Sequence, residues 1–301
     1  MKSSVSSNHR IILFFIDGLG VGELDPDYNP CTHTTHGIFC YSDGQLPFNG
    51  RQLPLDACLD VDGLPQSGSG QTTIYTGHNA AKLIGRHLFG FPNRQLRELI
   101  AKESLFVQLT KRNLKCKFIN AFRPLFFTTP EIFRHMRMSA TTEMNRAANL
   151  SFNTIQDITD KNALYHDFTN QIMKKYGFKL PLYKAEDAAN ILFSESKKYD
   201  LILYEYFMTD QAGHLQDMNR AVHILENLER LIYSLVSRIT QEQTSLIVIS
   251  DHGNIEDLRT KSHTRNPAFM AVWGIDDDLL GKPNALTDVL PIINRILGIR
   301  N

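Results

Sequence analysis

Acidic side chains follow three of the apolar runs in this sequence, where strands of a sheet would end. They are Asp17 after residues 11–16, Asp210 a few residues after 201–204, and Asp251 after 246–250. Ligands of an open parallel sheet bind outside the carboxyl ends of its strands. If these runs form neighbouring parallel strands, the three acids meet at one edge of the sheet although they are far apart in the chain.

Imidazole side chains accompany two of these acids. His214 lies four residues after Asp210, His252 directly follows Asp251, and His263 comes twelve residues after Asp251. Mixed aspartate and histidine ligands suit zinc, manganese or a related divalent ion. Crowded aspartates also repel one another strongly without a cation. Six candidate ligands exceed the needs of one tetrahedral ion, so the pattern predicts two divalent metal ions.

Each of these features has an ordinary structural explanation when it is taken alone. An aspartate at the end of a strand often caps the next helix. A histidine four residues after an aspartate arises by coincidence, and an Asp-His pair in a loop is commonly a solvated turn. The joint occurrence at several strand ends favours the metal site.

A serine- and glycine-rich stretch, PQSGSGQTTIYTG at residues 65–77, is typical of a loop that enters a helix. Free backbone N–H groups and the helix dipole at such a position favour a bound phosphate or sulfate. A serine bound to a metal loses its proton more readily and can attack phosphorus, while two cations neutralise charge on the transferring group. The alternative is a Ser/Gly turn with a capping role only.

Four apolar runs of strand type are the elements that must position these residues. They cover residues 10–16, 116–121, 201–204 and 245–249. Helical spacing of apolar residues precedes the last two, over 188–195 and 221–235, and recurs over 286–297, where Pro291 could interrupt the helix. Unbroken apolar strands alternating with helices predict an α/β fold with a mostly parallel central sheet covered by helices on both faces.

The composition excludes several classes of protein. The 301 residues are 42% hydrophobic, and 32 basic residues balance 32 acidic ones, so no global charge attracts nucleic acid or an anionic membrane. No apolar run is long enough to cross a membrane. The four cysteines are irregularly spaced and contain no CxxC pair, which predicts reduced thiols and a cytoplasmic protein. We expect a single domain over residues 1–301, with 124–182 as a lid or insertion within it.

Five short motifs, in this order, resemble the alkaline phosphatase superfamily. They are FIDGLG at 15–20, Ser67 with Gly70 and Thr76-Gly77, DQAGH at 210–214, SDHGN at 250–254, and HTRNP at 263–267. Within that superfamily, the chain is similar to the metalloenzyme domain shared by cofactor-independent phosphoglycerate mutase and phosphopentomutase. The resemblance extends over residues 11–273 as separate islands, of which SDHGN followed by HTxNP is specific.

The resemblance implies a role for each matching residue. Asp17, Ser67, Asp251 and His252 would hold one ion, Asp210, His214 and His263 would hold the other, and Ser67 would be the phosphorylated nucleophile. Superfamily nucleophiles lie nine residues before the threonine of a Thr-Gly pair, which selects Ser67, with Ser69 and Thr72 as alternatives. Lys82 and Arg86 could reach a substrate anion or could be solvated surface residues. His33, His36 and His166 lie outside the motifs.

These residues together predict a metal-dependent enzyme that hydrolyses a small-molecule phosphate ester through a phosphoserine, with manganese or zinc as the two ions. A related mutase keeps its phosphoenzyme away from water with a sizeable additional domain. The roughly sixty residues of 124–182 are few for such a cap, which favours hydrolysis. The alternatives are a phosphomutase and a non-catalytic metal-binding member. The sequence indicates no oligomeric state.

Overall fold

The computed structural model describes residues 9–40, 45–130, 138–239 and 243–299. Seven strands in this part form one sheet in the order β2-β3-β7-β6-β1-β5-β4. They are β1 (Arg10–Ile16), β2 (Gln45–Leu46), β3 (Gly50–Leu55), β4 (Cys116–Phe118), β5 (Leu201–Tyr206), β6 (Thr244–Ser250) and β7 (Ala268–Trp273).

The centre of the sheet is parallel, as predicted. β1 pairs in parallel with β5 on one side and with β6 on the other, and β4 continues the parallel arrangement beyond β5. β7 is antiparallel to β6, and β3 is antiparallel to β7, so β3 again has the direction of β6. Ile16 lies opposite Tyr206 and Ser250 in the register. This alignment brings the residues that follow β1, β5 and β6 to the same edge.

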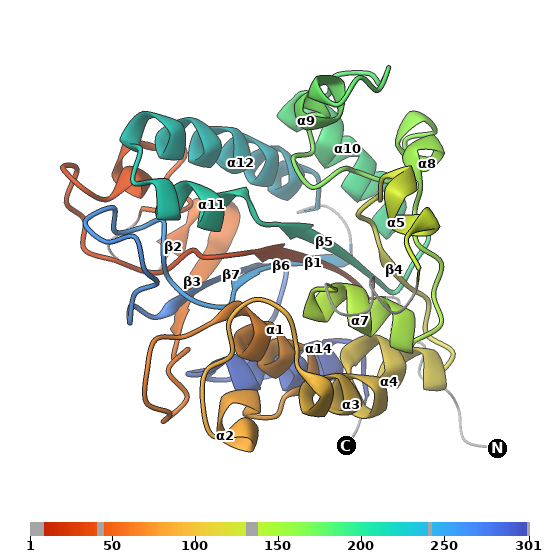
Figure 1. Cartoon of the computed structure of the whole chain (residues 1–301), viewed down its shortest axis with the longest axis horizontal. Helices are drawn as coiled ribbons and strands as arrows, with labels where there is room; N and C mark the ends of the chain where they lie inside the picture. Colours follow the sequence, from red (N-terminus) through yellow and green to blue (C-terminus); the bar gives the residue numbers. More distant parts are fainter. Residues whose placement is uncertain (1–8, 41–44, 131–137, 240–242, 300–301) are drawn as a thin grey trace.

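Helices cover both faces of the sheet, which confirms the predicted α/β class. In Figure 1, α10 and α12 lie above the sheet, and α1, α3 and α14 lie below it. The helices are α1 (Ser67–Thr76), α2 (Ala80–Ile84), α3 (Arg94–Glu103), α4 (Leu105–Lys111), α5 (Pro124–Thr128), α7 (Ala140–Ala147), α8 (Ile155–Thr159), α9 (Gln171–Lys175), α10 (Ala185–Ser196), α11 (Met208–Leu215), α12 (Met218–Ile239), α13 (Asp277–Leu280) and α14 (Val289–Ile296).

Alternation along β1 divides the core into two layers. Ile12, Phe14 and Ile16 belong to the layer that contains α10 and α12, whereas Ile11, Leu13 and Phe15 belong to the layer that contains α1 and α14. Successive side chains of a strand point to opposite faces. An apolar run without polar interruptions is therefore what a strand buried on both faces requires.

Some elements differ from the prediction. β2, β3 and β7 were not predicted, and β4 ends at Phe118, after which isolated bridges pair Asn120 with Leu164 and Ala121 with Asn153. At the C-terminus, a short 3-10 helix (Leu286–Asp288) precedes α14. Pro291 is the third residue of α14, within the first turn, where a missing N–H costs no intrahelical hydrogen bond.

The segment 124–182 contains α5, α7, α8 and α9, and residues 131–137 within it lie outside the described part. α7 contacts α1, α3 and α4 of the lower layer. A lid role for this segment stays a prediction.

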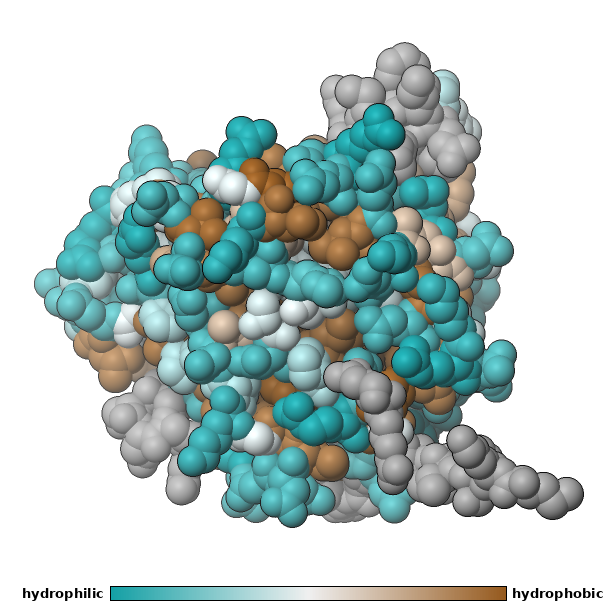
Figure 2. Space-filling view, turned by 90° about the horizontal axis from the view of Figure 1, so that it is seen from below, coloured by the Kyte–Doolittle hydropathy of each residue, from teal (hydrophilic) through white to brown (hydrophobic). Residues whose placement is uncertain are grey.

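Two findings concern the predictions about membranes and cysteines. No helix among the described residues is long and apolar enough to cross a membrane. The four cysteines, all within the described part, are free. Figure 2 shows the face formed by the lower helices, where hydrophilic side chains separate the hydrophobic ones into small patches.

Candidate metal centre and nucleophile

The structure brings all six predicted aspartate and histidine ligands to the carboxyl edge of the parallel strands. Asp17 directly follows β1, and Asp251 and His252 directly follow β6. Asp210 and His214 lie one turn apart on α11, which follows β5, and His263 lies in the connection between β6 and β7. The ligand atoms form two groups, each within 4.8 Å: Asp17, Asp251 and His252 in one, Asp210, His214 and His263 in the other.

The first group, Asp17, Asp251 and His252, is the more deeply buried of the two. His252 Nε2 lies 3.2 Å from Asp17 Oδ1 and 3.6 Å from Asp251 Oδ2, and both His252 and Asp251 are fully buried. Ser67 Oγ lies 3.0 Å from His252 Nε2 and 3.5 Å from Asp17 Oδ1. The predicted nucleophile therefore directly borders this group.

The second group, Asp210, His214 and His263, surrounds one carboxylate. His214 Nε2 lies 3.2 Å from Asp210 Oδ2, and His263 Nε2 lies 3.4 Å from Asp210 Oδ1. Asn254 donates to Asp210 Oδ1 at 2.7 Å and to its backbone carbonyl at 3.1 Å. The rings of His252 and His263 stack with centroids 3.8 Å apart, so the two groups are in contact.

The backbone hydrogen bonds of two histidines fit a role as metal ligands. His214 Nδ1 lies 2.5 Å from the Lys261 carbonyl, and His263 Nδ1 lies 2.7 Å from the Pro65 carbonyl. A carbonyl only accepts, so each Nδ1 carries the proton and each Nε2 of the neutral ring has a free lone pair. Both Nε2 atoms face Asp210. A backbone hydrogen bond on the outer nitrogen is the usual support of a metal-binding histidine.

The electrostatics of the cluster also fit divalent cations. Burial, followed by repulsion from Asp17, raises the pKa of Asp251 well above its usual value. Burial lowers the pKa of His252, but attraction by Asp251 and Asp17 outweighs it and brings that pKa to about 10. Burial tends to raise the pKa of Asp210, but the charge of His252 and the Asn254 hydrogen bond contribute to a net shift below its usual value. Three carboxylates this close need positive charge.

The start of α1 places Ser67 at the edge of this cluster. α1 begins at Ser67 itself, so the free N–H groups of its first turn are adjacent to the hydroxyl. Gly70 permits α1 to approach the end of β6 closely, because a Cβ at this position would lie 2.9 Å from the Asp251 carbonyl oxygen. One turn after Ser67, Gln71 donates to Asp251 Oδ2 at 3.3 Å.

The two alternative nucleophiles are engaged elsewhere. Ser69 Oγ donates to the Gln66 carbonyl at 3.1 Å and accepts from Leu88 N at 3.1 Å. Thr72 Oγ1 donates to the Gly68 carbonyl at 2.7 Å. Neither hydroxyl has a hydrogen bond to one of the six ligands among the described residues, whereas Ser67 does.

The predicted substrate cations lie outside both ligand groups. Lys82 is on α2, its side chain is 70% exposed, and its Nζ lies 4.0 Å from Asp60 Oδ2. Arg86 follows α2 and is exposed. The segment after Arg86 packs against the first turn of α1. A Cβ on Gly68 would lie only 2.8 Å from the Leu88 carbonyl oxygen. Leu88 lies two residues after Arg86 and six after Lys82, so Arg86 is the closer of the two in sequence to this contact with α1.

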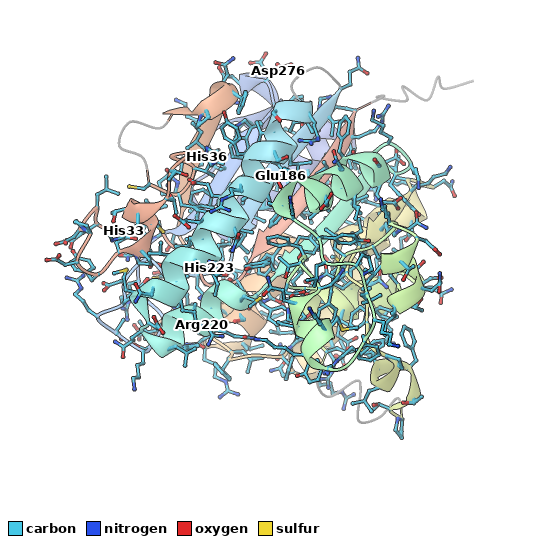
Figure 3. The ribbon with its side chains drawn as sticks, turned by 90° about the horizontal axis from the view of Figure 1, so that it is seen from above. His33, His36, Glu186, Arg220, His223 and Asp276 are labelled. Carbon is cyan, nitrogen blue, oxygen red and sulfur yellow. The ribbon has the colours of Figure 1, made fainter. Side chains whose placement is uncertain are left out.

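The histidines left outside the motifs also lie outside the ligand groups. Figure 3 shows His33 and His36 beside α12, in the layer above the sheet. His36 stacks on Tyr233 with centroids 4.2 Å apart. His166 stacks on Phe207 at 4.3 Å, and burial lowers its pKa to about 3.

Sequence reasoning missed three neighbours of the ligands: Gln71, Asn254 and Glu205. Gln71 has a helical signal, because it lies one turn after Ser67, and Asn254 belongs to the SDHGN motif. Glu205 stands in the apolar run of β5 without any distinguishing pattern. Burial, and then the charge of Asp17, raises the pKa of Glu205 to about 8, although Thr141 and Ser139 donate to it.

Comparison with known proteins identifies the family to which this chain is similar. The family model of the Metalloenzyme superfamily matches residues 9–300. The 2,3-bisphosphoglycerate-independent phosphoglycerate mutase of Desulforudis audaxviator is 27% identical over 128 residues, which are 40% of this chain and 25% of that protein. Mutase 2 of Methanosarcina barkeri is 30% identical over 112 residues, 35% of this chain and 21% of that protein. The matched stretches thus cover a quarter or less of these mutases.

Solved structures show the fold over nearly the whole chain. The alkaline phosphatase of the Antarctic bacterium TAB5 matches with a TM-score of 0.59 at 11% identity, over 97% of this chain and 99% of that one. The alkaline phosphatase of Thermus thermophilus matches with a TM-score of 0.55 at 10% identity, over 97% and 92%. From the family match and this alkaline-phosphatase-like fold, we conclude that the chain belongs to the Metalloenzyme superfamily.

Proposed function

We propose that this protein is a metal-dependent phosphoryl-transfer enzyme that hydrolyses a small-molecule phosphate ester, with Ser67 as the nucleophile. The observation that carries the proposal is the position of Ser67 Oγ, 3.0 Å from His252 Nε2 and 3.5 Å from Asp17 Oδ1 at the start of α1. The hydroxyl thus adjoins a ligand group and a helix N-terminus, which favours a phosphate.

Each part of the site has a task in this reaction. Asp17, Asp251, His252 and Ser67 would hold one manganese or zinc ion, and Asp210, His214 and His263 would hold the second. When bound, the ions stabilise negative charge on the transferring group and favour the ionised serine. The Ser67 hydroxyl gives its proton to solvent, Oγ bonds to phosphorus, the ester P–O bond breaks, and the leaving oxygen takes a proton from solvent to give the alcohol. A water molecule then bonds to phosphorus, the P–Oγ bond breaks, a proton of the water returns to Ser67 Oγ, and inorganic phosphate is released.

Hydrolysis and mutase activity differ in the fate of the phosphoserine. The likeness to phosphoglycerate mutases favours the mutase. The size of segment 124–182 favours hydrolysis, because part of it packs into the lower helical layer through α7 and leaves fewer residues to exclude water. We therefore propose hydrolysis as the main reaction and mutase activity as the second candidate.

One set of assays separates these outcomes. Metal-free protein is reloaded with manganese, zinc or magnesium and tested on phosphate monoesters, phosphodiesters, sulfate esters, 2- and 3-phosphoglycerate and pentose phosphates. The proposal predicts release of inorganic phosphate with at least one metal. Isomer interconversion without free phosphate establishes the mutase, and bound metal without turnover establishes a non-catalytic member of the family.

Arg86 and Lys82 are proposed substrate contacts that the same assays can rank. Arg86→Ala is expected to raise KM about tenfold, the usual order for losing one charged hydrogen bond. Lys82→Ala is the matched comparison and is expected to change KM less, because its side chain is largely exposed near Asp60. Unchanged KM in both variants would remove these residues from the substrate site.

A further inference from the structure

Glu256 is a fully buried carboxylate that belongs to neither ligand group. It lies five residues after Asp251, in the connection between β6 and β7. We propose that Glu256 is the positioning residue that sets the spacing of the two metal sites by joining three short segments that carry their ligands, one after β1 and two in the β6–β7 connection. The inference rests on the proposed metal centre and is independent of the reaction catalysed there.

The hydrogen bonds of Glu256 use both of its oxygens. Oε2 accepts from the backbone N–H groups of Gly20 and Asn254, each at 2.8 Å. Oε1 accepts from Thr264 Oγ1 at 2.6 Å and from Asn266 Nδ2 at 3.0 Å. All four partners donate, and an ionised carboxylate is the side chain that only accepts. Its negative charge also strengthens each bond.

The four donors come from three short segments that bear proposed metal ligands, one in the loop after β1 and two in the connection between β6 and β7. Gly20 lies three residues after Asp17, Asn254 two residues after His252, and Thr264 and Asn266 one and three residues after His263. Asn254 itself donates to Asp210. One carboxylate is thus linked through short stretches of chain to residues of both ligand groups.

Close packing around Glu256 makes this connection rigid. The side chain lies so close to Gly20 and Gly253 that neither position has room for a Cβ, and a Cβ on Gly22 would lie 2.9 Å from Glu256 Cγ. Loops held this tightly leave their ligands little freedom to move. A displacement of Glu256 would therefore be transmitted to Asp17, His252 and His263.

A merely stabilising carboxylate is the competing explanation, and Glu229 provides the control. Glu229 is also fully buried, and it also accepts backbone hydrogen bonds, from His36 and Ile38 at 2.8 Å each. It lies on α12, and its partners belong to a loop without metal ligands. Glu229→Gln thus reproduces the loss of a buried charge without touching the ligand loops.

The test compares the metal-free full chain with Glu256→Gln and Glu229→Gln. Each protein is titrated with cobalt(II), whose visible absorption reports ligand geometry, and with zinc by calorimetry, and its unfolding temperature is measured without metal. In Glu256→Gln, the amide group faces donors and loses two of the four bonds. We expect affinity for both ions to fall by about ten- to a hundredfold, the range seen when metal-ligand supports are removed, and the cobalt spectrum to change.

The control defines what contradicts the proposal. Glu229→Gln is expected to lower the unfolding temperature while leaving the metal affinity and the cobalt spectrum as in the original chain. Thr264→Val, which removes one bond to Glu256, is the milder variant if Glu256→Gln does not fold, and it should lower affinity less. Wild-type affinity and spectrum in a folded Glu256→Gln or in Thr264→Val overturn the inference. Metal binding without phosphoryl transfer would contradict the proposed function alone.

Discussion

The proposed ligands differ in how far water reaches them. Asp251 and His252 are fully buried, whereas the side chain of His214 is 37% exposed. A buried ligand cannot be replaced by a water molecule without opening the fold, but an exposed one can. Loss of Asp251 should therefore affect metal binding more than loss of His214.

Two variants test this difference. Asp251→Asn is expected to leave about one tightly bound ion per chain, because the first group loses a charged ligand that the packing cannot replace. His214→Ala should retain two ions and bind one of them more weakly. Elemental analysis after dialysis measures both. Two tightly bound ions in Asp251→Asn would contradict the assignment.

His166 makes folding stability depend on pH. The unfolded chain takes up a proton at this residue below about pH 6.5, but the folded chain does so only near its lowered pKa of about 3. The contribution of His166 to the free energy of unfolding is thus lost as the pH falls from about 6.5 toward 3. Between pH 7 and pH 5, the free energy of unfolding should fall about 2 kcal/mol more in the wild type than in His166→Phe. Denaturant titrations at both pH values measure this, and parallel pH dependences would contradict it.

At the scale of elements, the sequence predicts the parts that are uniformly buried. The residues of β1, β5 and β6 that the apolar runs mark are present as strands, and the helical spacing over 188–195 and 221–235 corresponds to α10 and α12. The acids after the apolar runs and the histidines near them predicted the six side chains that the structure brings together. These features need only local hydrophobicity and short motifs.

The remaining elements have no comparable local signal. β3 contains Pro54, which lacks the N–H of a ladder residue and argues against a strand. β7 is as apolar as the predicted strands but immediately follows Pro267 in a motif that is otherwise a loop. The role of Glu256 depends on the contact of the β6–β7 connection with the loop after β1, which meet only in the folded chain, and no spacing in the sequence indicates it.

The close contact between α1 and the end of β6 can be tested at Gly70. In an open helix, Gly→Ala stabilises by up to about 1 kcal/mol. Here the added Cβ would lie 2.9 Å from the Asp251 carbonyl, so α1 must move away from the first ligand group. Gly70→Ala is expected to lower kcat roughly a hundredfold, as small displacements of reacting groups do, and to weaken binding of one ion.

The neighbouring glycine is the comparison for this variant. A Cβ on Gly68 would meet the Leu88 carbonyl at 2.8 Å and not Asp251. Gly68→Ala should therefore displace the segment that follows the proposed substrate contact Arg86. We expect it to raise KM and to keep both ions bound. Full activity of Gly70→Ala would show that α1 does not set the position of Ser67.

At the scale of the whole molecule, the candidate metal centre lies where three parallel strands end. Asp17 lies 193 residues before Asp210 and 234 before Asp251, and the fold brings the three carboxylates together. Their mutual repulsion opposes folding unless cations are bound. Metal binding and folding stability should consequently be coupled.

Metal removal tests this coupling. Chelation is expected to abolish activity and to lower the unfolding temperature by roughly 5 °C or more, the effect of losing a ligand present at about a hundred times its Kd. Manganese or zinc should restore both properties. Scanning calorimetry with and without chelator measures the shift, and an active protein without divalent metal would contradict the account.

The most direct measurement is the detection of a phosphoryl group on Ser67. The metal-loaded protein is mixed with a phosphate ester that it turns over, quenched in acid within the first turnovers, and digested for mass spectrometry. The account predicts one added phosphoryl group on the peptide that contains Ser67, in the wild type and not in Ser67→Ala, which should keep its metal and lose turnover. Normal turnover by Ser67→Ala, or a phosphoryl group on Ser69 or Thr72, would contradict it.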